Sequence, residues 1–251
     1  MRVIRLAGFH LRQFASVPYF IQLMLLTTLA AALVQYVGYA AWGGVSATQG
    51  WLRAGIIGMW TTTTSAAGII GFERHKGTLI YLVMGTMRPQ FSLAALVCSA
   101  ATFGLASFAV AWAVWAALSG SWSFTDFSDT ATGLSIIGGV ASLYIGSLAV
   151  SIVISALFVL TPNAIAYEGM LLVPVMIASG VLMTSQPASG LWGISALLPI
   201  ATPVRLLYSG SVSVGGALVW VAITALWFGL GYVLMGRALR LAYRSGTLEL
   251  V

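Results

Sequence analysis

Charged residues are scarce in this sequence, and cysteine and histidine are nearly absent. Only 6% of the 251 residues are charged, and the chain contains five acidic residues, two histidines and one cysteine. The single cysteine, Cys98, has no partner for a disulfide or for a thiolate metal site. A hydrophobic content of 60% and a mean hydropathy of +1.00 exclude an ordinary soluble domain. The composition therefore predicts a membrane protein.

Residues that could form a catalytic centre, a metal site or a nucleotide site are equally sparse. His10 and His75 lie far apart in the sequence, and no carboxylate cluster or nucleophile motif accompanies them. Lys76-Gly77-Thr78 has the wrong order for a phosphate-binding loop, in which Gly-Lys-Thr follows an earlier glycine. The formal net charge of +6 could indicate nucleic-acid binding, but the basic residues are dispersed at the ends of apolar runs. We therefore expect neither an enzyme nor a nucleic-acid-binding protein.

Charged residues divide the chain into six long charge-free runs. Each run can hold the roughly 20 apolar residues that a helix needs to cross a bilayer. The expected membrane spans are at about residues 19–41, 52–71, 91–118, 131–160, 163–184 and 215–236. The sequence thus predicts an all-α protein with six transmembrane helices.

The N-terminal segment before the first span has its own pattern. Ile4, Ala7, Leu11 and Phe14 recur at helical spacing, while the arginines of this segment lie on another face. This pattern predicts an amphipathic helix on the membrane surface. The alternative is a basic flank that only orients the first span.

The segment Leu191–Tyr208 is apolar, but Pro199, Pro203 and Arg205 argue against a seventh span. Six spans place nine of the eleven basic residues on the inner side and leave only Arg53 and Arg205 outside. A seventh span would reduce that asymmetry to six against five. We therefore expect a re-entrant or interfacial hairpin on the outer face, with both termini in the cytoplasm.

A charged island, Phe72–Pro89, lies between the second and third spans. Because so many charges cannot lie in hydrocarbon, the island must be a loop in water between two membrane helices. Glu73, Gly77-Thr78-Leu79 and Pro89 in this island resemble the Glu…Gly-Thr-Leu…Pro signature of ABC-2 type transporter permeases. Ile80 stands where many members of that family carry a second acid.

This resemblance implies a single ABC-2 transmembrane domain over residues 1–251, with a cytoplasmic coupling helix inside the island. The coupling helix would dock on a separate ATP-binding subunit, which would bind ATP and Mg. The complete transporter would hold two such subunits and a second permease, identical or homologous. The residues implied in ATPase coupling are Glu73, Arg74, His75, Lys76, Gly77, Thr78, Leu79, Leu82, Val83, Met87 and Arg88.

Within residues 77–88, a small helix pressed against a partner needs apolar anchors and a basic edge. Leu79, Leu82, Val83 and Met87 are the predicted anchors. By resemblance, Glu73 and Arg74 would transmit the motion. The alternative is a connecting loop whose apolar face lies in lipid.

Three further groups of polar residues each have two possible roles. The hydroxyls of Thr61, Thr62, Thr63, Thr64 and Ser65 could serve tight helix packing or line a transport path. Glu168 could be a structural anchor near the inner interface or act in gating or ion coupling. The stripe of Arg237, Arg240 and Arg244 could bind anionic headgroups or contact the ATPase.

We expect a permease subunit of an exporter in the inner (plasma) membrane of a prokaryote. An apolar path would suit a hydrophobic or amphiphilic substrate such as a drug, an antimicrobial peptide or a lipid-like molecule. A polysaccharide or lipid-linked glycan is a less favoured cargo, because Leu11–Phe20 lacks the Arg-Tyr-rich motif of polysaccharide exporters. The competing class is a secondary transporter driven by an ion gradient, with Glu168 as the coupling group.

Overall fold

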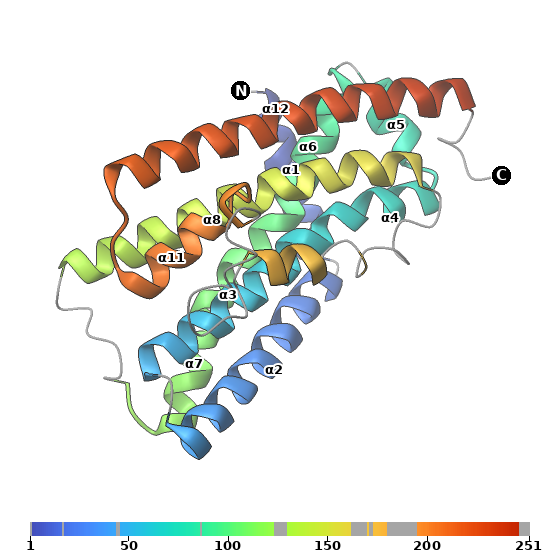
Figure 1. Cartoon of the computed structure of the whole chain (residues 1–251). Helices are drawn as coiled ribbons and strands as arrows, with labels where there is room; N and C mark the ends of the chain where they lie inside the picture. The colour runs from blue at the N-terminus through green and yellow to red at the C-terminus, as the bar shows by residue number, and fades with distance from the viewer. Residues whose placement is uncertain are drawn as a thin grey trace.

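The structure, a computed structural model, is an elongated bundle of helices that lie roughly side by side (Figure 1). It describes residues 2–16, 18–43, 46–85, 87–122, 130–161, 170, 173–179 and 195–245. Within these ranges every regular element is a helix, which confirms the predicted all-α class.

Four helical stretches in the described residues are long and apolar enough to cross a membrane. They are Pro18–Trp42, Pro89–Ser119, Thr132–Leu160 and Val214–Arg244. The corresponding elements are α2 (Pro18–Trp42), α6 (Pro89–Ala101) with η2 (Thr102–Leu105) and α7 (Ala106–Ser119), α8 (Thr130–Leu160) and α12 (Val214–Ser245). These stretches match the first, third, fourth and sixth predicted spans and support the transmembrane character of the chain.

The second predicted span, 52–71, is formed by α3 (Ala47–Ser65), η1 (Ala66–Gly68) and α4 (Ile69–His75), and it is not one of the four. Its helix begins at Ala47, because the Ser46 hydroxyl accepts a hydrogen bond from the Gln49 amide at 3.2 Å. Nearly all of α3 is buried against α2, α7 and α8. A membrane helix that packs on other helices tolerates small and polar residues at its interfaces, and α3 is rich in glycine and threonine.

The fifth predicted span, 163–184, lies largely outside the described residues. The expected count of six spans therefore stays a prediction.

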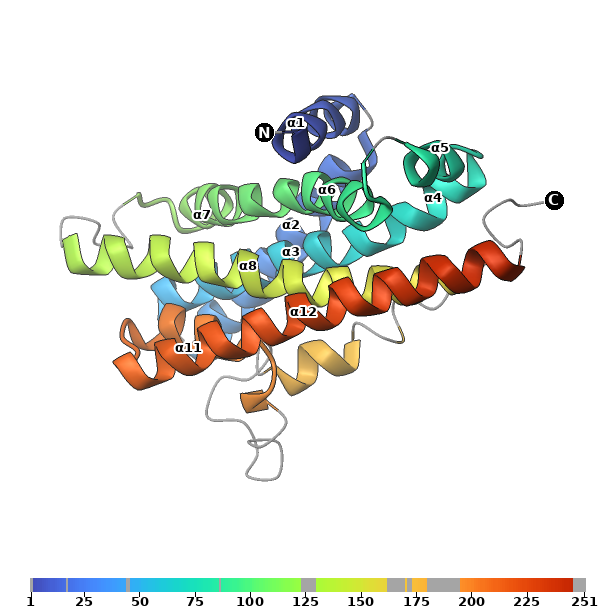
Figure 2. The same ribbon diagram turned by 90° about the horizontal axis from the view of Figure 1, so that it is seen from above.

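The N-terminal helix α1 (Arg2–Ala15) lies on the outer side of α6 (Figure 2). The Ser99 hydroxyl of α6 donates a hydrogen bond to the Ala7 carbonyl at 2.9 Å. Phe14 and His10 are buried, while Arg5 and Arg12 are exposed. The predicted amphipathic helix is thus confirmed as a helix, and its place on a membrane surface stays a prediction.

The described part of the predicted hairpin folds as a turn followed by the short helix α11 (Ala201–Ser209), which packs along α8. Pro203 falls in the first turn of α11, where its missing N–H breaks no helical bond. The indole N–H groups of Trp220 and Trp227 bond to the carbonyls of Pro199 and Leu197 at 2.7 and 2.9 Å. Helix α11 alone is too short to cross a bilayer, and the re-entrant or interfacial hairpin on the outer face stays a prediction.

Most of the basic side chains outside α1 lie at one end of the bundle. Helix α4, helix α5 (Leu79–Met84) and the C-terminal end of α12 lie at one end (Figure 1). The turn between α2 and α3, the end of α7 and helix α11 lie at the other. Arg74 lies in α4, Lys76 is the C-cap residue of α4, Arg88 is the N-cap residue of α6, and three arginines lie in the last turns of α12. Arg53 lies in the first half of α3, and Arg205 lies in α11. The α4–α5 end is therefore the more basic of the two.

Candidate functional site

The candidate site is the corner at which α4 turns into α5, and its backbone is fixed by a Schellman cap. The Gly77 amide donates to the Arg74 carbonyl, and the Thr78 amide donates to the Glu73 carbonyl, both at 2.9 Å. Gly77 has a φ of +70°, the left-handed conformation that such a cap requires and that glycine adopts at least cost. Gly77 therefore terminates α4.

The side chain of Glu73 reinforces the same turn. The Thr78 hydroxyl donates a hydrogen bond to Glu73 Oε2 at 2.5 Å, and Lys76 Nζ lies 3.7 Å from Glu73 Oε1. Glu73 is almost fully buried, whereas the Lys76 side chain is half exposed. One cap thus explains the spacing of the acid, the glycine and the threonine. Glu73 lies in the last turn of α4, Gly77 ends the helix, and Thr78 folds back to bond to Glu73.

Arg74 joins the corner to a different part of the bundle. Its guanidinium donates to the carbonyl of Thr161 at 2.9 Å and to the carbonyl of Val159, both at the C-terminal end of α8. The side chain is only 1% exposed, and burial lowers the pKa of its guanidinium. A cation at this position satisfies carbonyls that have no partner within α8 and interacts favourably with the helix dipole. Arg74 therefore ties α4 to the C-terminal end of α8.

The burial of residues on α5 differs from the sequence expectation that its apolar anchors face a partner. Leu79 and Val83, two of the predicted partner-facing anchors, are buried in a core with α6 and other helices. They are not available to a partner, because α5 needs their i, i+4 face to pack on its own chain. Leu82 and Met87 are partly buried.

The exposed face of α5 contains two large apolar residues that the sequence analysis did not single out. Tyr81 is 77% exposed and Met84 is 70% exposed. Their i, i+3 spacing, opposite Leu79 and Val83, was the signal that could have found them. Exposed His75, Lys76 and Arg88 lie before and after this face in the chain. We call the exposed set His75, Lys76, Tyr81, Met84 and Arg88 the corner surface.

Replacing Gly77 by alanine should loosen this corner. A Cβ at Gly77 meets no atom within 4 Å, so the substitution has only a conformational cost. That cost is about 1–2 kcal/mol for a left-handed residue. Thermal unfolding in detergent should show the loss for Gly77→Ala and none for Gly133→Ala, a helical glycine that also has open space around it. Equal stability of the two variants would contradict the assigned cap.

The hydroxyl run of α3 lies inside the bundle. Thr61, Thr62 and Thr64 donate to carbonyls of their own helix at 2.9, 2.8 and 2.6 Å. Ser151 of α8 donates to the Thr63 carbonyl at 2.8 Å. Thr62, Thr63 and Thr64 have no exposed area in the single chain. These contacts favour the packing interpretation over a transport path through this helix.

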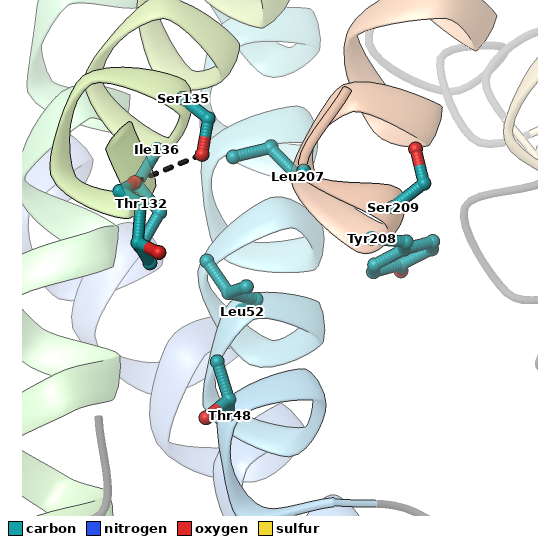
Figure 3. A pocket seen from close by; sticks show the side chains of 9 residues that line it. Thr48, Leu52, Thr132, Ser135, Ile136, Leu207, Tyr208 and Ser209 are labelled. Carbon is teal, nitrogen blue, oxygen red and sulfur yellow. Dashed lines mark hydrogen bonds between the residues drawn. The ribbon is translucent and has the colours of Figure 1, made fainter. Parts of the chain in front are cut away.

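Two other parts of the chain carry polar groups. Glu168 lies outside the described residues. At the end opposite the corner, a hollow of about 320 Å³ lies between α3, α8 and α11 (Figure 3). Ser135 and Ser209, which line the hollow, donate their hydroxyls to backbone carbonyls of Thr132 and Arg205 at 2.9 and 2.8 Å, so these two hydroxyls are already used within the chain. In the described residues, no group of three or more His, Cys, Asp or Glu side chains could hold a metal ion.

Comparison with known proteins adds no relative. No family model, no curated protein and no solved structure matches this chain. The sequence motif and the geometry of the corner are therefore the features that indicate a function.

Proposed function

We propose that this chain is the permease subunit of an ATP-driven exporter of the ABC-2 type. The observation that carries the proposal is the corner between α4 and α5, which is closed by a hydrogen-bonded cap, tied to α8 through Arg74 and exposed on one face. In this proposal the permease has six spans, pairs with a second permease, and receives motion from two separate ATP-binding subunits.

Rigidity is what a mechanical connection needs. The cap at Gly77 and the Glu73–Thr78 hydrogen bond restrain the turn itself, and the Arg74 contacts restrain it relative to α8. Packed helices move as discrete bodies rather than deforming continuously. A push on α5 would therefore displace α4 and the end of α8 together.

The corner surface has the composition of a docking site. Tyr81 and Met84 would be apolar anchors, and His75, Lys76 and Arg88 would form a polar rim. Aromatic and methionine side chains are enriched at the centres of interfaces, and charges at the rim set register. The basic rim also keeps this surface at the water boundary, where a cytoplasmic subunit can reach it.

The proposed substrate is hydrophobic or amphiphilic, such as a drug, an antimicrobial peptide or a lipid-like molecule. Because 60% of the residues are hydrophobic, a path between two copies of such a chain would be lined mostly by apolar side chains. A path would form between two permeases and would alternate between inward and outward access as the ATP-binding subunits close and reopen.

The test is purification of the chain from native membranes, identification of its partners by mass, and transport by the reconstituted complex. We expect a nucleotide-binding subunit in the preparation and transport that stops with vanadate but persists when ion gradients are dissipated. Transport by the isolated chain, or transport that is lost with Glu168→Gln and with an ionophore but not with vanadate, would contradict the proposal and favour the ion-coupled class.

A further inference from the structure

The C-terminal part of α12 presents three exposed arginines on one face. Arg237, Arg240 and Arg244 are spaced at i, i+3 and i+7, and together with Leu241 they line a hollow of about 270 Å³. The Arg240 Nε donates to the Gly236 carbonyl of the preceding turn at 3.2 Å. That bond holds the Arg240 side chain along the helix and leaves its terminal nitrogens free to bind an anion.

No acidic side chain in the described residues neutralises this cluster. Glu73 is the only acid that the described ranges contain, and its ion pair is with Lys76. Like charges one turn apart on a helix repel each other. An external anion would remove that repulsion.

The position of the cluster along α12 indicates what the anion belongs to. Leu226, Leu230 and Val233 are exposed, and they lie on the same helical stripe as Arg237, Arg240 and Arg244. The stripe therefore changes from apolar to cationic between Val233 and Arg237. In a membrane-spanning helix such a change marks the boundary between hydrocarbon and headgroups.

The outer location of α12 agrees with this placement. Figure 2 shows α12 along one side of the bundle, where most of its length is not covered by other helices. Exposed Leu241 and Tyr243 lie beside the arginines. An apolar and aromatic border suits the glycerol and upper acyl chain of a lipid.

We propose that Arg237, Arg240 and Arg244 form a binding site for the phosphate headgroup of an anionic phospholipid. A guanidinium can bind a phosphate through two parallel hydrogen bonds, which an ammonium cannot do. The site does not depend on the transport function proposed above, because it requires only that α12 spans a bilayer.

Native mass spectrometry of the purified full chain in detergent tests this site directly, with phosphatidylglycerol and phosphatidylcholine as probes. We expect saturable binding of phosphatidylglycerol and only weak binding of phosphatidylcholine. Each basic residue near a membrane surface contributes roughly a fivefold gain in affinity for anionic lipid, so Arg240→Ala should lose about fivefold and Arg237→Ala/Arg240→Ala about 25-fold. The matched control is Arg205→Ala, an exposed arginine toward the other end of the bundle, which should leave binding unchanged.

Further measurements distinguish a lipid headgroup from free phosphate and from the ATPase as the ligand. Inorganic phosphate at millimolar concentration should fail to displace phosphatidylglycerol, and displacement would overturn the proposal in favour of a free-phosphate site. Equal loss in Arg205→Ala would show unspecific attraction and would also overturn it. If Arg237→Ala/Arg240→Ala leaves lipid binding unchanged and instead weakens binding of the ATPase, these arginines belong to the interface with the ATPase, and the lipid site is wrong. Circular dichroism melting of each variant excludes unfolding as the cause of any loss.

Discussion

Tyr81→Asp and Met84→Asp are expected to abolish the coupling of ATP hydrolysis to transport while leaving the permease folded. Both side chains are exposed, so a carboxylate there remains in water and has little effect on the stability of the chain. At a docking surface, loss of an anchor side chain typically costs about 2 kcal/mol or more, a factor of about 30 in affinity. The measurement is substrate-stimulated ATPase activity of the reconstituted complex, with binding of the ATPase followed separately.

Leu79→Asp is the matched comparison for these variants. Leu79 is fully buried in the same helix, so a carboxylate there must be desolvated in an apolar core. We expect a folding defect of several kcal/mol, visible as poor expression and a lowered melting temperature. If Tyr81→Asp unfolds the chain and Leu79→Asp does not, the assignment of the two faces of α5 is wrong.

Arg74→Met is expected to disconnect the corner from α8. The substitution preserves most of the side-chain volume but removes the guanidinium that bonds to the carbonyls of Val159 and Thr161. Hydrogen bonds to a charged group contribute about 1.5–3 kcal/mol each, and the two carbonyls would lose their donor in a buried place. We expect a loss of about 3 kcal/mol in the free energy of unfolding and an ATPase that no longer drives transport.

Two controls make the Arg74 experiment specific. Arg88→Met removes an exposed arginine from the same end of the bundle and should have little effect on stability. Arg74→Lys should be intermediate, because an ammonium on a shorter reach cannot serve both carbonyls as a planar guanidinium does. Hydrogen exchange at the end of α8 should rise in Arg74→Met, and unchanged exchange there would contradict the assigned contact.

The sequence predicted the all-α class and the location of the corner well, because both follow from local composition. Long apolar runs indicate long helices, and the charged island indicates a break between two of them. Glu73, Gly77 and Thr78 lie within six residues of one another, so their hydrogen bonds are a local property of the chain.

Contacts between segments that are distant in the sequence could not be predicted from local composition. Arg53 looked like a residue at the start of the second span, but the helix begins at Ala47, and Arg53 is buried with its guanidinium 5.4 Å from the centre of the Tyr208 ring. The inward face of α5 depends on where α6 lies, and nothing in residues 77–88 encodes that position. Likewise, the partners of Arg74 are 85 and 87 residues away in the sequence.

Photo-crosslinking from a probe placed at Tyr81, in native membranes, tests the central claim most directly. A second probe at Trp42, an exposed residue at the end of α2 toward the opposite end of the bundle, serves as the control. The account predicts that the Tyr81 probe captures a nucleotide-binding polypeptide, that the yield changes with vanadate, and that the Trp42 probe captures none. Failure of the Tyr81 probe to capture such a subunit, or labelling of position 81 only from the outer side of sealed cells, would contradict it.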